Sequence, residues 1–221
     1  MKSHKTPLRY PGGKSRACTK IGQFLPNMYT YREFREPFLG GGSVAIYLTK
    51  MYPSLSIWVN DLYEPLVNFW KEIQHSGEEL YTTLSDLKIK YPNPDSAKEL
   101  FLESKKIINS RDKNKLERAV AFYIVNKCSF SGLTESSSFS AQASDSNFSM
   151  RGIEKLTGYQ EIIQDWKITN LSYEDLLTDW KDTFIYLDPP YDIKDNLYGK
   201  SGEMHKKFDH VKFSKDCDDH T

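Results

Sequence analysis

The chain of 221 residues is poor in cysteine, has no long apolar run and carries no excess of charge of either sign. Its three cysteines, Cys18, Cys128 and Cys217, are widely spaced and form no CxxC pair. This excludes the disulfide framework of a small secreted domain and fits a reducing compartment. The longest apolar run, Ala119–Val125, is too short to span a bilayer, and no signal peptide is visible. We therefore expect a soluble, cytoplasmic protein with no membrane partner.

The charge balance also limits the kinds of partner. Thirty basic residues balance thirty acidic ones, which argues against a wholly electrostatic nucleic-acid binder. The charge is uneven, because residues 1–20 contain six lysines and arginines and no acid, whereas residues 216–219 include three aspartates. A basic stretch is usually a solvated face, so this asymmetry carries little weight.

Hydrophobic patterns predict an alternation of strands and helices. A strand over residues 33–39, interrupted by Pro37, runs directly into Gly40-Gly41-Gly42-Ser43. After Pro65, a tolerated helix start, apolar residues recur at helical spacing. They are Leu66, Phe69, Trp70 and Ile73. The serine-rich residues 129–149 follow neither period and predict a loop. The remaining expected elements are helices at Ser43–Met51, after Asp95, around 116–124 and over 153–166, and strands at Ser54–Val59, Lys167–Leu171 and Thr183–Leu187.

This order predicts the α/β class, with an open parallel sheet. We expect one discontinuous domain made of residues 1–64 and 166–221. Residues 65–165 are expected to form a helical, loop-rich insertion.

The most informative motif is Asp188-Pro189-Pro190-Tyr191, which follows the apolar run Phe184–Leu187. The two prolines fix φ and donate no backbone N–H, so the turn is stiff and presents carbonyl acceptors. A carboxylate beside free carbonyls and an aromatic ring suits a planar ligand with an NH2 group, such as a nucleobase. The alternative is a proline-rich strand exit capped by an aspartate.

A glycine turn and a spaced acid form the second constellation. Gly40-x-Gly42-x-x-Ala45 fits a strand that turns tightly into a helix, and Asp61 follows Gly42 by nineteen residues. An acid at that position can accept hydrogen bonds from ribose hydroxyls. The pair predicts a nucleoside-bearing ligand. The alternative is a sharp turn followed by an ordinary helix cap.

Two other patterns are rejected. Pro11-Gly12-Gly13-Lys14-Ser15 lacks the first glycine of a phosphate-binding loop, because Leu8 stands there, and no apolar strand precedes it. Lys14 can still offer a point charge to a carboxylate. His205 and His210 have neither the spacing nor the cysteines of a structural zinc site, so no metal is expected.

The glycine turn and the acid are common to dinucleotide dehydrogenases and nucleotide-dependent methyltransferases. Hydride transfer does not need a rigid acidic turn, whereas methylation of an exocyclic amine does. The N6 lone pair of adenine is delocalised into the ring. Asp188 and the carbonyl of Pro189 could each accept one N6 hydrogen and expose that lone pair, with Tyr191 stacked on the base. Such a base must leave the duplex.

The chain resembles the Dam-like (alpha-group) DNA adenine-N6 methyltransferases over nearly its whole length. Four motifs occur in the family's order: Arg9-Tyr10-Pro11-Gly12-Gly13-Lys14, Glu36–Ser43, Asn60-Asp61 and Asp188–Tyr191. The resemblance implies a Rossmann-like cofactor-binding catalytic domain, a target-recognition insertion, and site-specific methylation of adenine N6 in double-stranded DNA. It implies S-adenosyl-L-methionine as the cofactor, with these contacts: Tyr10, Lys14, Phe38, Gly40, Gly42, Asp61, Ser172, Tyr173 and Asp188. Lys14 would meet the methionine carboxylate and Asp61 the ribose.

The stretch Asn126–Leu133 is similar to the family segment that enters the DNA. The implied DNA-binding residues are Asn126, Lys127, Phe130, Ser131, Leu133, Glu135 and Arg151. Phe130 would wedge between bases, and Lys127 and Arg151 would contact phosphates. Glu135 stands where relatives that methylate GATC have an arginine. An acid accepts from cytosine N4, so a different target sequence is expected.

Family members usually continue for several tens of residues beyond the stretch that resembles Leu197–His210. We therefore expect a chain ending at Thr221 to lack a further strand and a hairpin. The alternative function is a truncated, non-catalytic remnant that binds S-adenosyl-L-methionine or DNA without turnover. The sequence leaves open the recognition site, the oligomeric state and whether a restriction enzyme partner exists.

Overall fold

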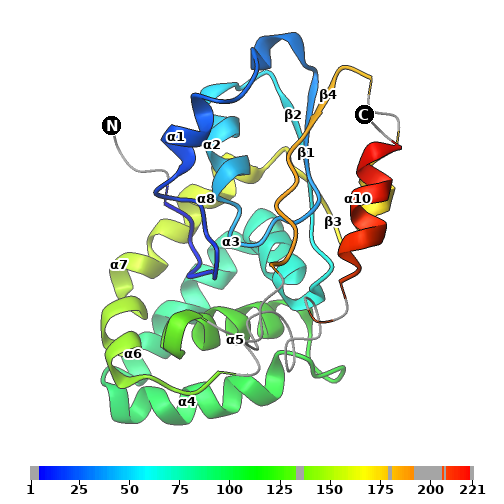
Figure 1. Ribbon diagram of the computed structural model, residues 1–221. Helices are drawn as coiled ribbons and strands as arrows, with labels where there is room; N and C mark the ends of the chain where they lie inside the picture. Colours follow the sequence, from blue (N-terminus) through cyan, green and yellow to red (C-terminus); the bar gives the residue numbers. More distant parts are fainter. Residues whose placement is uncertain (1–4, 133–136, 179–180, 192–205, 207, 220–221) are drawn as a thin grey trace.

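A four-stranded parallel sheet is the centre of the structure. The computed structural model describes residues 5–132, 137–178, 181–191, 206 and 208–219 (Figure 1). The strands lie in the order β3-β2-β1-β4, and every neighbouring pair is parallel. Their bounds are β1, Glu33–Glu36; β2, Ser56–Asn60; β3, Lys167–Thr169; and β4, Thr183–Ile185. This confirms the predicted α/β class, because parallel neighbours need crossover connections.

The register brings three strand ends to one edge of the sheet. Glu36 pairs with Val59, and Arg35 pairs with Ile185. The segments that follow β1, β2 and β4 therefore leave the sheet side by side. Each strand is shorter than its predicted range. β1 stops before Pro37, as expected for a residue that cannot donate to the ladder.

Short helices lie beside the sheet. Helices α1 (Cys18–Gly22), α2 (Ser43–Met51) and α8 (Lys155–Ile163) lie on one side, and α10 (His210–Asp218) lies on the other (Figure 1). The 3-10 turn η1 (Met28–Thr30) leads into β1. α2 has the bounds that the sequence predicts, and it begins directly after the glycine turn. Among the described residues, no helix combines the length and apolarity needed to cross a membrane.

A second layer of helices lies below the sheet (Figure 1): α4 (Pro94–Ile107), α5 (Lys115–Cys128), α6 (Ala141–Asn147) and α7 (Met150–Ile153). Helix α3 (Glu64–Lys90) connects this layer to the sheet, because it contacts α5 as well as α8 and β3. The four apolar residues at helical spacing in α3 are fully buried, as predicted: Leu66, Phe69, Trp70 and Ile73.

The two parts of the chain share one hydrophobic core. Phe69 of α3 packs on Phe122 of α5, with ring centroids 5.4 Å apart, and Trp70 lies 5.9 Å from Trp166. The division into residues 1–64 with 166–221 and an insertion of 65–165 stays a prediction.

The serine-rich region differs from the predicted loop. It contains the 3-10 turn η2 (Phe130–Gly132), the helix α6 and an isolated bridge between Ser129 and Phe139. Serine hydroxyls begin the helices here: Ser140 Oγ accepts from Ala143 N at 3.2 Å. Short helices that begin with a serine cap and contain few apolar residues have no apolar spacing from which they could be predicted.

Candidate active site

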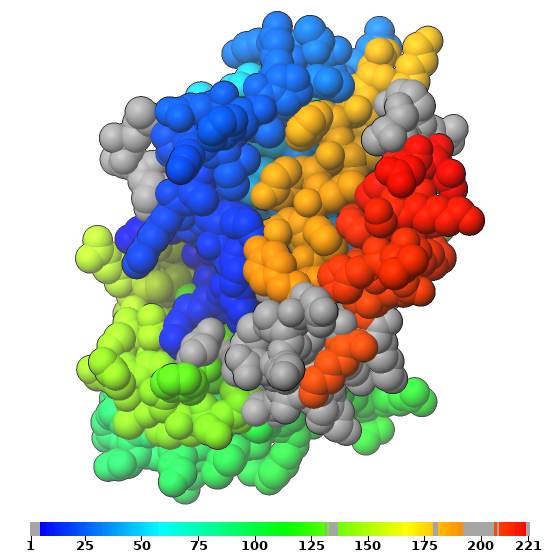
Figure 2. Space-filling view, viewed as in Figure 1, coloured from blue at the N-terminus to red at the C-terminus, as the bar shows by residue number. Residues whose placement is uncertain are grey.

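A cavity of about 510 Å³ opens where β1, β2 and β4 end. Its walls come from residues 10–14, 36–44, 60–63, 171–174 and 188–191, with Phe208, Asp209 and Lys212 completing them. Figure 2 shows the N-terminal segment in blue, β4 and the residues after it in orange, and α10 in red, side by side on one face. This edge of a parallel α/β sheet is where such folds bind ligands, and the volume suits a small molecule.

The turn after β1 requires its glycines. Gly40 has φ of +48° and Gly42 has φ of +67°. A Cβ on Gly40 would lie 2.8 Å from Cε1 of Tyr10, and one on Gly42 would lie 2.8 Å from Cζ2 of Trp70. The indole N–H of Trp70 also donates to the Gly40 carbonyl at 3.2 Å. The turn is therefore packed tightly on both sides and exposes bare backbone to the cavity.

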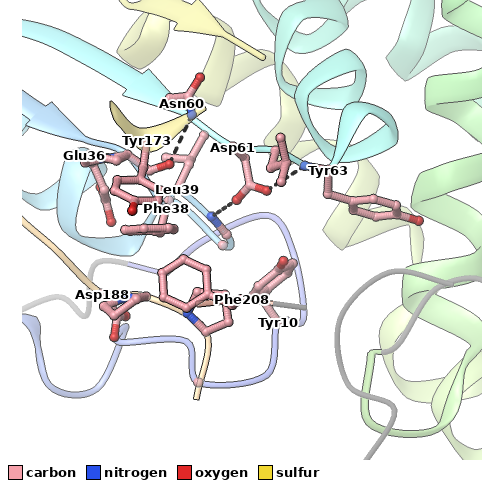
Figure 3. A pocket seen from close by; sticks show the side chains of 18 of the residues that line it. Tyr10, Glu36, Phe38, Leu39, Asn60, Asp61, Tyr63, Tyr173, Asp188 and Phe208 are labelled. Atoms are coloured by element: carbon pink, nitrogen blue, oxygen red, sulfur yellow. Dashed lines mark hydrogen bonds between the residues drawn. The ribbon is translucent and has the colours of Figure 1, made fainter. Parts of the chain in front are cut away.

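Asp61 holds this turn against the start of α3. Its Oδ2 accepts from Gly40 N at 2.9 Å, and its Oδ1 accepts from Tyr63 N at 3.0 Å (Figure 3). Burial raises the pKa of Asp61 to about 6, although the backbone hydrogen bonds oppose the rise. The Leu62 backbone also bonds to this carboxylate, which still has acceptor capacity left for a ligand hydroxyl.

Glu36 is a buried acid of the site that the sequence prediction missed. Its Oε2 accepts from Ala45 N at 3.0 Å in the first turn of α2. Burial raises the pKa of Glu36 well above its ordinary value. The sequence did contain a signal for this role. Glu36 stands directly before Pro37, where the strand ends, and this end lies at the same edge of the sheet as Asp61.

The Asp188-Pro189-Pro190-Tyr191 turn lies against the N-terminal loop. Lys14 Nζ donates to Asp188 Oδ2 at 2.5 Å, to Tyr191 Oη at 2.7 Å and to the Gly12 carbonyl at 2.9 Å. Tyr191 also donates to Asp188 Oδ1 at 3.2 Å. Burial alone would lower the pKa of Lys14, but the hydrogen bonds to Asp188 and Tyr191 outweigh it and raise the pKa above its usual range.

Three aromatic rings, Phe38, Tyr173 and Phe208, line another part of the cavity, and Phe213 packs on them from outside the lining. The ring of Phe38 lies 5.6 Å from Tyr173, 5.7 Å from Phe208 and 5.7 Å from Phe213 (centroid distances). The Tyr173 hydroxyl donates to Asp216 Oδ2 at 2.6 Å. Sequence patterns missed Phe208 and Phe213, because the segment that carries them has no apolar period. These faces make the wall suitable for a flat ring.

All of the predicted cofactor contacts and the whole of Asp188–Tyr191 line this one cavity. The cofactor contacts are Tyr10, Lys14, Phe38, Gly40, Gly42, Asp61, Ser172, Tyr173 and Asp188. Their convergence is the main feature of the site. Lys14 is engaged with Asp188, a pairing that the sequence analysis did not foresee.

The predicted DNA contacts are less uniform. Asn126 is completely buried, and its amide bonds to the backbone of Arg9 and Gly132. The Lys127 ammonium lies 5.1 Å from the Tyr123 ring centroid, and burial, aided by Arg9 and Lys155, lowers the pKa of Lys127 to about 8. The Lys127 side chain is half-buried, and the DNA-binding roles of both residues stay predictions.

Phe130 and Arg151 are exposed, Phe130 with 68% of its surface accessible. The backbone of Ser131 lies in η2. Leu133 and Glu135 lie outside the described residues, as does His205. Within the described ranges, no group of three histidine, cysteine or acidic side chains is placed to hold a metal ion.

The chain is similar to known DNA methyltransferases. Residues 10–220 match the family model described as D12 class N6 adenine-specific DNA methyltransferase. Three curated proteins are similar over parts of the chain.

The Type II methyltransferase M.MjaIII of Methanocaldococcus jannaschii is 25% identical over 83% of this chain and 68% of its own length. The Type II methyltransferase M1.LlaDCHI of Lactococcus lactis subsp. cremoris is 24% identical over 83% of this chain and 64% of its own. The DNA N-6-adenine-methyltransferase of Escherichia phage P1 is 29% identical over 58% of this chain and 15% of its own. The chain thus spans about two thirds of two of these relatives and a small part of the third.

Proposed function

The chain belongs to the D12 class N6 adenine-specific DNA methyltransferase family, and we propose that it transfers a methyl group from S-adenosyl-L-methionine to adenine N6 at specific sites in duplex DNA. The observation that carries this proposal is the Asp188–Tyr191 turn. It lies on the wall of a cavity that also contains a cation, a buried acid and a cluster of aromatic rings.

The cavity has a complementary group for each part of the proposed cofactor. The Phe38 and Tyr173 rings suit a flat adenine, and the Asp61 carboxylate suits ribose hydroxyls. Lys14 suits a carboxylate, and the glycine turn allows close approach of the ligand. When bound, S-adenosyl-L-methionine supplies an electrophilic methyl group. The protein's part is to hold it and to prepare the nucleophile.

Asp188 and Pro189 would prepare the target amine. The Asp188 carboxylate and the Pro189 carbonyl are two acceptors for the two N6 hydrogens of adenine. Proline has no N–H that could compete with or repel the amine. Hydrogen bonds that hold both hydrogens out of the ring plane localise the nitrogen lone pair. The same acceptors stabilise the positive charge that develops on nitrogen during transfer, and loss of one N6 proton would then restore a neutral amine.

The base would reach these acceptors only after leaving the duplex. The Tyr191 ring is 43% exposed at the turn and offers a face for stacking. Phe130 is an exposed aromatic that could fill the gap left in the helix. Arg151 is the proposed phosphate contact. Asn126 is buried and Lys127 is half-buried, so we propose that they support the DNA-binding segment and do not contact DNA themselves.

The names of two relatives support a setting for this activity. Both are type II methyltransferases, so we include in the proposal a restriction enzyme with the same target sequence. A DNA substrate and cysteines suited to a reducing compartment support a cytoplasmic location.

Methylation-sensitive sequencing of DNA from cells that express the chain tests this function. We expect N6-methyladenine within one short sequence motif, and none in cells that express Asp188→Ala. Unmodified adenines in both cultures, with the wild-type chain present and folded, would contradict the proposal.

A further inference from the structure

The buried side chain of Asn126 joins two segments that lie 117 residues apart. Its Oδ1 accepts from Arg9 N at 3.0 Å, and its Nδ2 donates to the Arg9 carbonyl at 2.6 Å. Nδ2 also donates to the Gly132 carbonyl at 2.8 Å. The Asn126 amide thus bonds to both the backbone N–H and the carbonyl of Arg9, and also to the Gly132 carbonyl. A carboxylate or an apolar side chain of the same size cannot do this.

Two more contacts hold Arg9 against the same segment. The Arg9 guanidinium donates to the Ser129 carbonyl at 2.7 Å. Gly132 has φ of +74°, and a Cβ there would lie 2.5 Å from both the Cβ and the carbonyl oxygen of Arg9. The two backbones are therefore as close as glycine allows.

Arg9 is one residue away from a wall of the cavity. The Tyr10 ring packs on the glycine turn, so closely that a Cβ on Gly40 would lie 2.8 Å from Cε1 of Tyr10. The Tyr10 carbonyl accepts from Gly13 N at 3.0 Å, directly before Lys14. A displacement of Arg9 therefore reaches the proposed cofactor contacts Tyr10 and Lys14.

The other end of this connection presents Phe130. Its N–H donates to the Ser138 carbonyl at 3.0 Å, and Ser140 N–H donates to the Cys128 carbonyl at 2.9 Å. The backbone on either side of Phe130 is held in place while its ring stays exposed. The position of this ring is thereby tied, through Asn126, to that of Arg9.

We propose that Asn126 is a positioning residue that couples cofactor binding to DNA binding, and that it is not itself a DNA contact. This inference rests on the proposed function. The cofactor would fix the position of the segment at Arg9, and DNA would fix the position of the segment at Phe130. Because Asn126 joins these two segments, each ligand would strengthen the binding of the other. The coupling is reciprocal, so one ratio of affinities measures it.

The test uses S-adenosyl-L-homocysteine, which lacks the transferable methyl group, as a non-reacting probe. Its dissociation constant is measured by calorimetry with and without saturating unmethylated linear duplex DNA of mixed sequence. For the wild-type chain we expect DNA to lower the dissociation constant of S-adenosyl-L-homocysteine by about fivefold or more. In Asn126→Asp, which keeps the acceptor and loses both donors, this ratio should fall to about one.

Asn68→Asp is the matched control. Asn68 is also buried, and its Nδ2 donates to the Lys115 carbonyl at 2.9 Å, which ties α3 to α5 away from both segments. We expect Asn68→Asp to lower the melting temperature about as much as Asn126→Asp does. Unlike Asn126→Asp, it should keep the wild-type affinity ratio. Gly132→Ala is the second test variant if Asn126→Asp does not fold, because it separates the segments without removing a polar group.

A wild-type ratio of one would overturn the inference, as would a preserved ratio in Asn126→Asp or Gly132→Ala. Loss of the ratio in Asn68→Asp as well would reduce the effect to general destabilisation and overturn it too. Binding of both ligands without coupling leaves the proposed function intact. A wild-type chain that binds neither ligand refutes the function, and the inference with it.

Discussion

The ammonium of Lys14 lies 2.5 Å from Oδ2 of Asp188, which is 174 residues later in the chain. Its other hydrogen bonds go to Gly12 and Tyr191, so one cation holds the loop, the carboxylate and the ring in a single arrangement. The proposed cofactor carboxylate needs the same cation. Cofactor binding should therefore draw Lys14 away and free Asp188 Oδ2 for the target amine.

Lys14→Gln should weaken the binding of S-adenosyl-L-homocysteine by about tenfold to a hundredfold, because a hydrogen bond to a charged group contributes about 1.5–3 kcal/mol. Titration calorimetry measures the change. Lys20→Gln removes an equal charge from an exposed position outside the cavity and serves as the control. Equal affinity in Lys14→Gln and the wild-type chain would remove Lys14 from the cofactor site.

Asp61 should make cofactor affinity depend on pH. Its pKa is raised to about 6, so near pH 5 only about a tenth of the protein has the ionised form that accepts ribose hydrogen bonds. We expect S-adenosyl-L-homocysteine to bind about tenfold more tightly at pH 7 than at pH 5. Asp61→Asn should bind weakly at both pH values. A wild-type affinity that does not change over this range would contradict the ribose role.

The same shift predicts a stability effect with a definite sign. The folded pKa lies above the ordinary value of 3.8, so the folded state binds the proton more strongly than the unfolded state. This contribution is fully present below pH 4 and is lost as the pH rises through 6. Relative to Asp61→Asn, the free energy of unfolding of the wild-type chain should therefore decrease from pH 4 to pH 6.5, as urea denaturation would measure.

Gly42→Ala should destabilise the fold by about 2–4 kcal/mol. It combines left-handed backbone strain with a Cβ that would lie 2.8 Å from the Trp70 ring. Gly158 in α8 is the control, because a Cβ there meets nothing within 4 Å. Gly158→Ala should be neutral or stabilising by up to about 1 kcal/mol. Equal midpoints in urea for the two variants would mean that the turn is not tightly packed.

Arg151 and Lys127 should differ in their effect on DNA binding. Arg151→Gln should weaken binding about equally for all sequences and reduce the slope of log affinity against log salt by about 0.9. Lys127→Met should leave that slope unchanged, because the Lys127 side chain is half-buried and its ammonium lies over the Tyr123 ring. Filter binding at several salt concentrations separates the two. A reduced slope in Lys127→Met would show that Lys127 does contact a DNA phosphate.

The sheet and its ligand-binding edge were predictable because they follow from short-range patterns. The apolar spacing after Pro65 and the glycine turn before α2 each specify local backbone geometry, and the structure has both. The same logic locates Asp61 and Asp188, since strands of a parallel sheet end at a common edge.

Contacts between distant segments were not predictable in this way. The Lys14–Asp188 pair, the Asn126–Arg9 hydrogen bonds and the packing of Phe208 on Phe38 each join residues more than 100 positions apart. No local period signals them. Lys14, Asp188 and Asn126 were predicted to contact ligands, because a sequence does not reveal partners within the protein.

The most direct test of the account identifies the base that receives the methyl group. Purified chain is incubated with unmethylated duplex DNA and S-adenosyl-L-methionine with a labelled methyl group, and the DNA is digested to nucleosides for mass spectrometry. We predict label only in N6-methyldeoxyadenosine, and none with Asp188→Ala of equal melting temperature. Label in a cytosine nucleoside, or equal label from Asp188→Ala, would contradict the central claim.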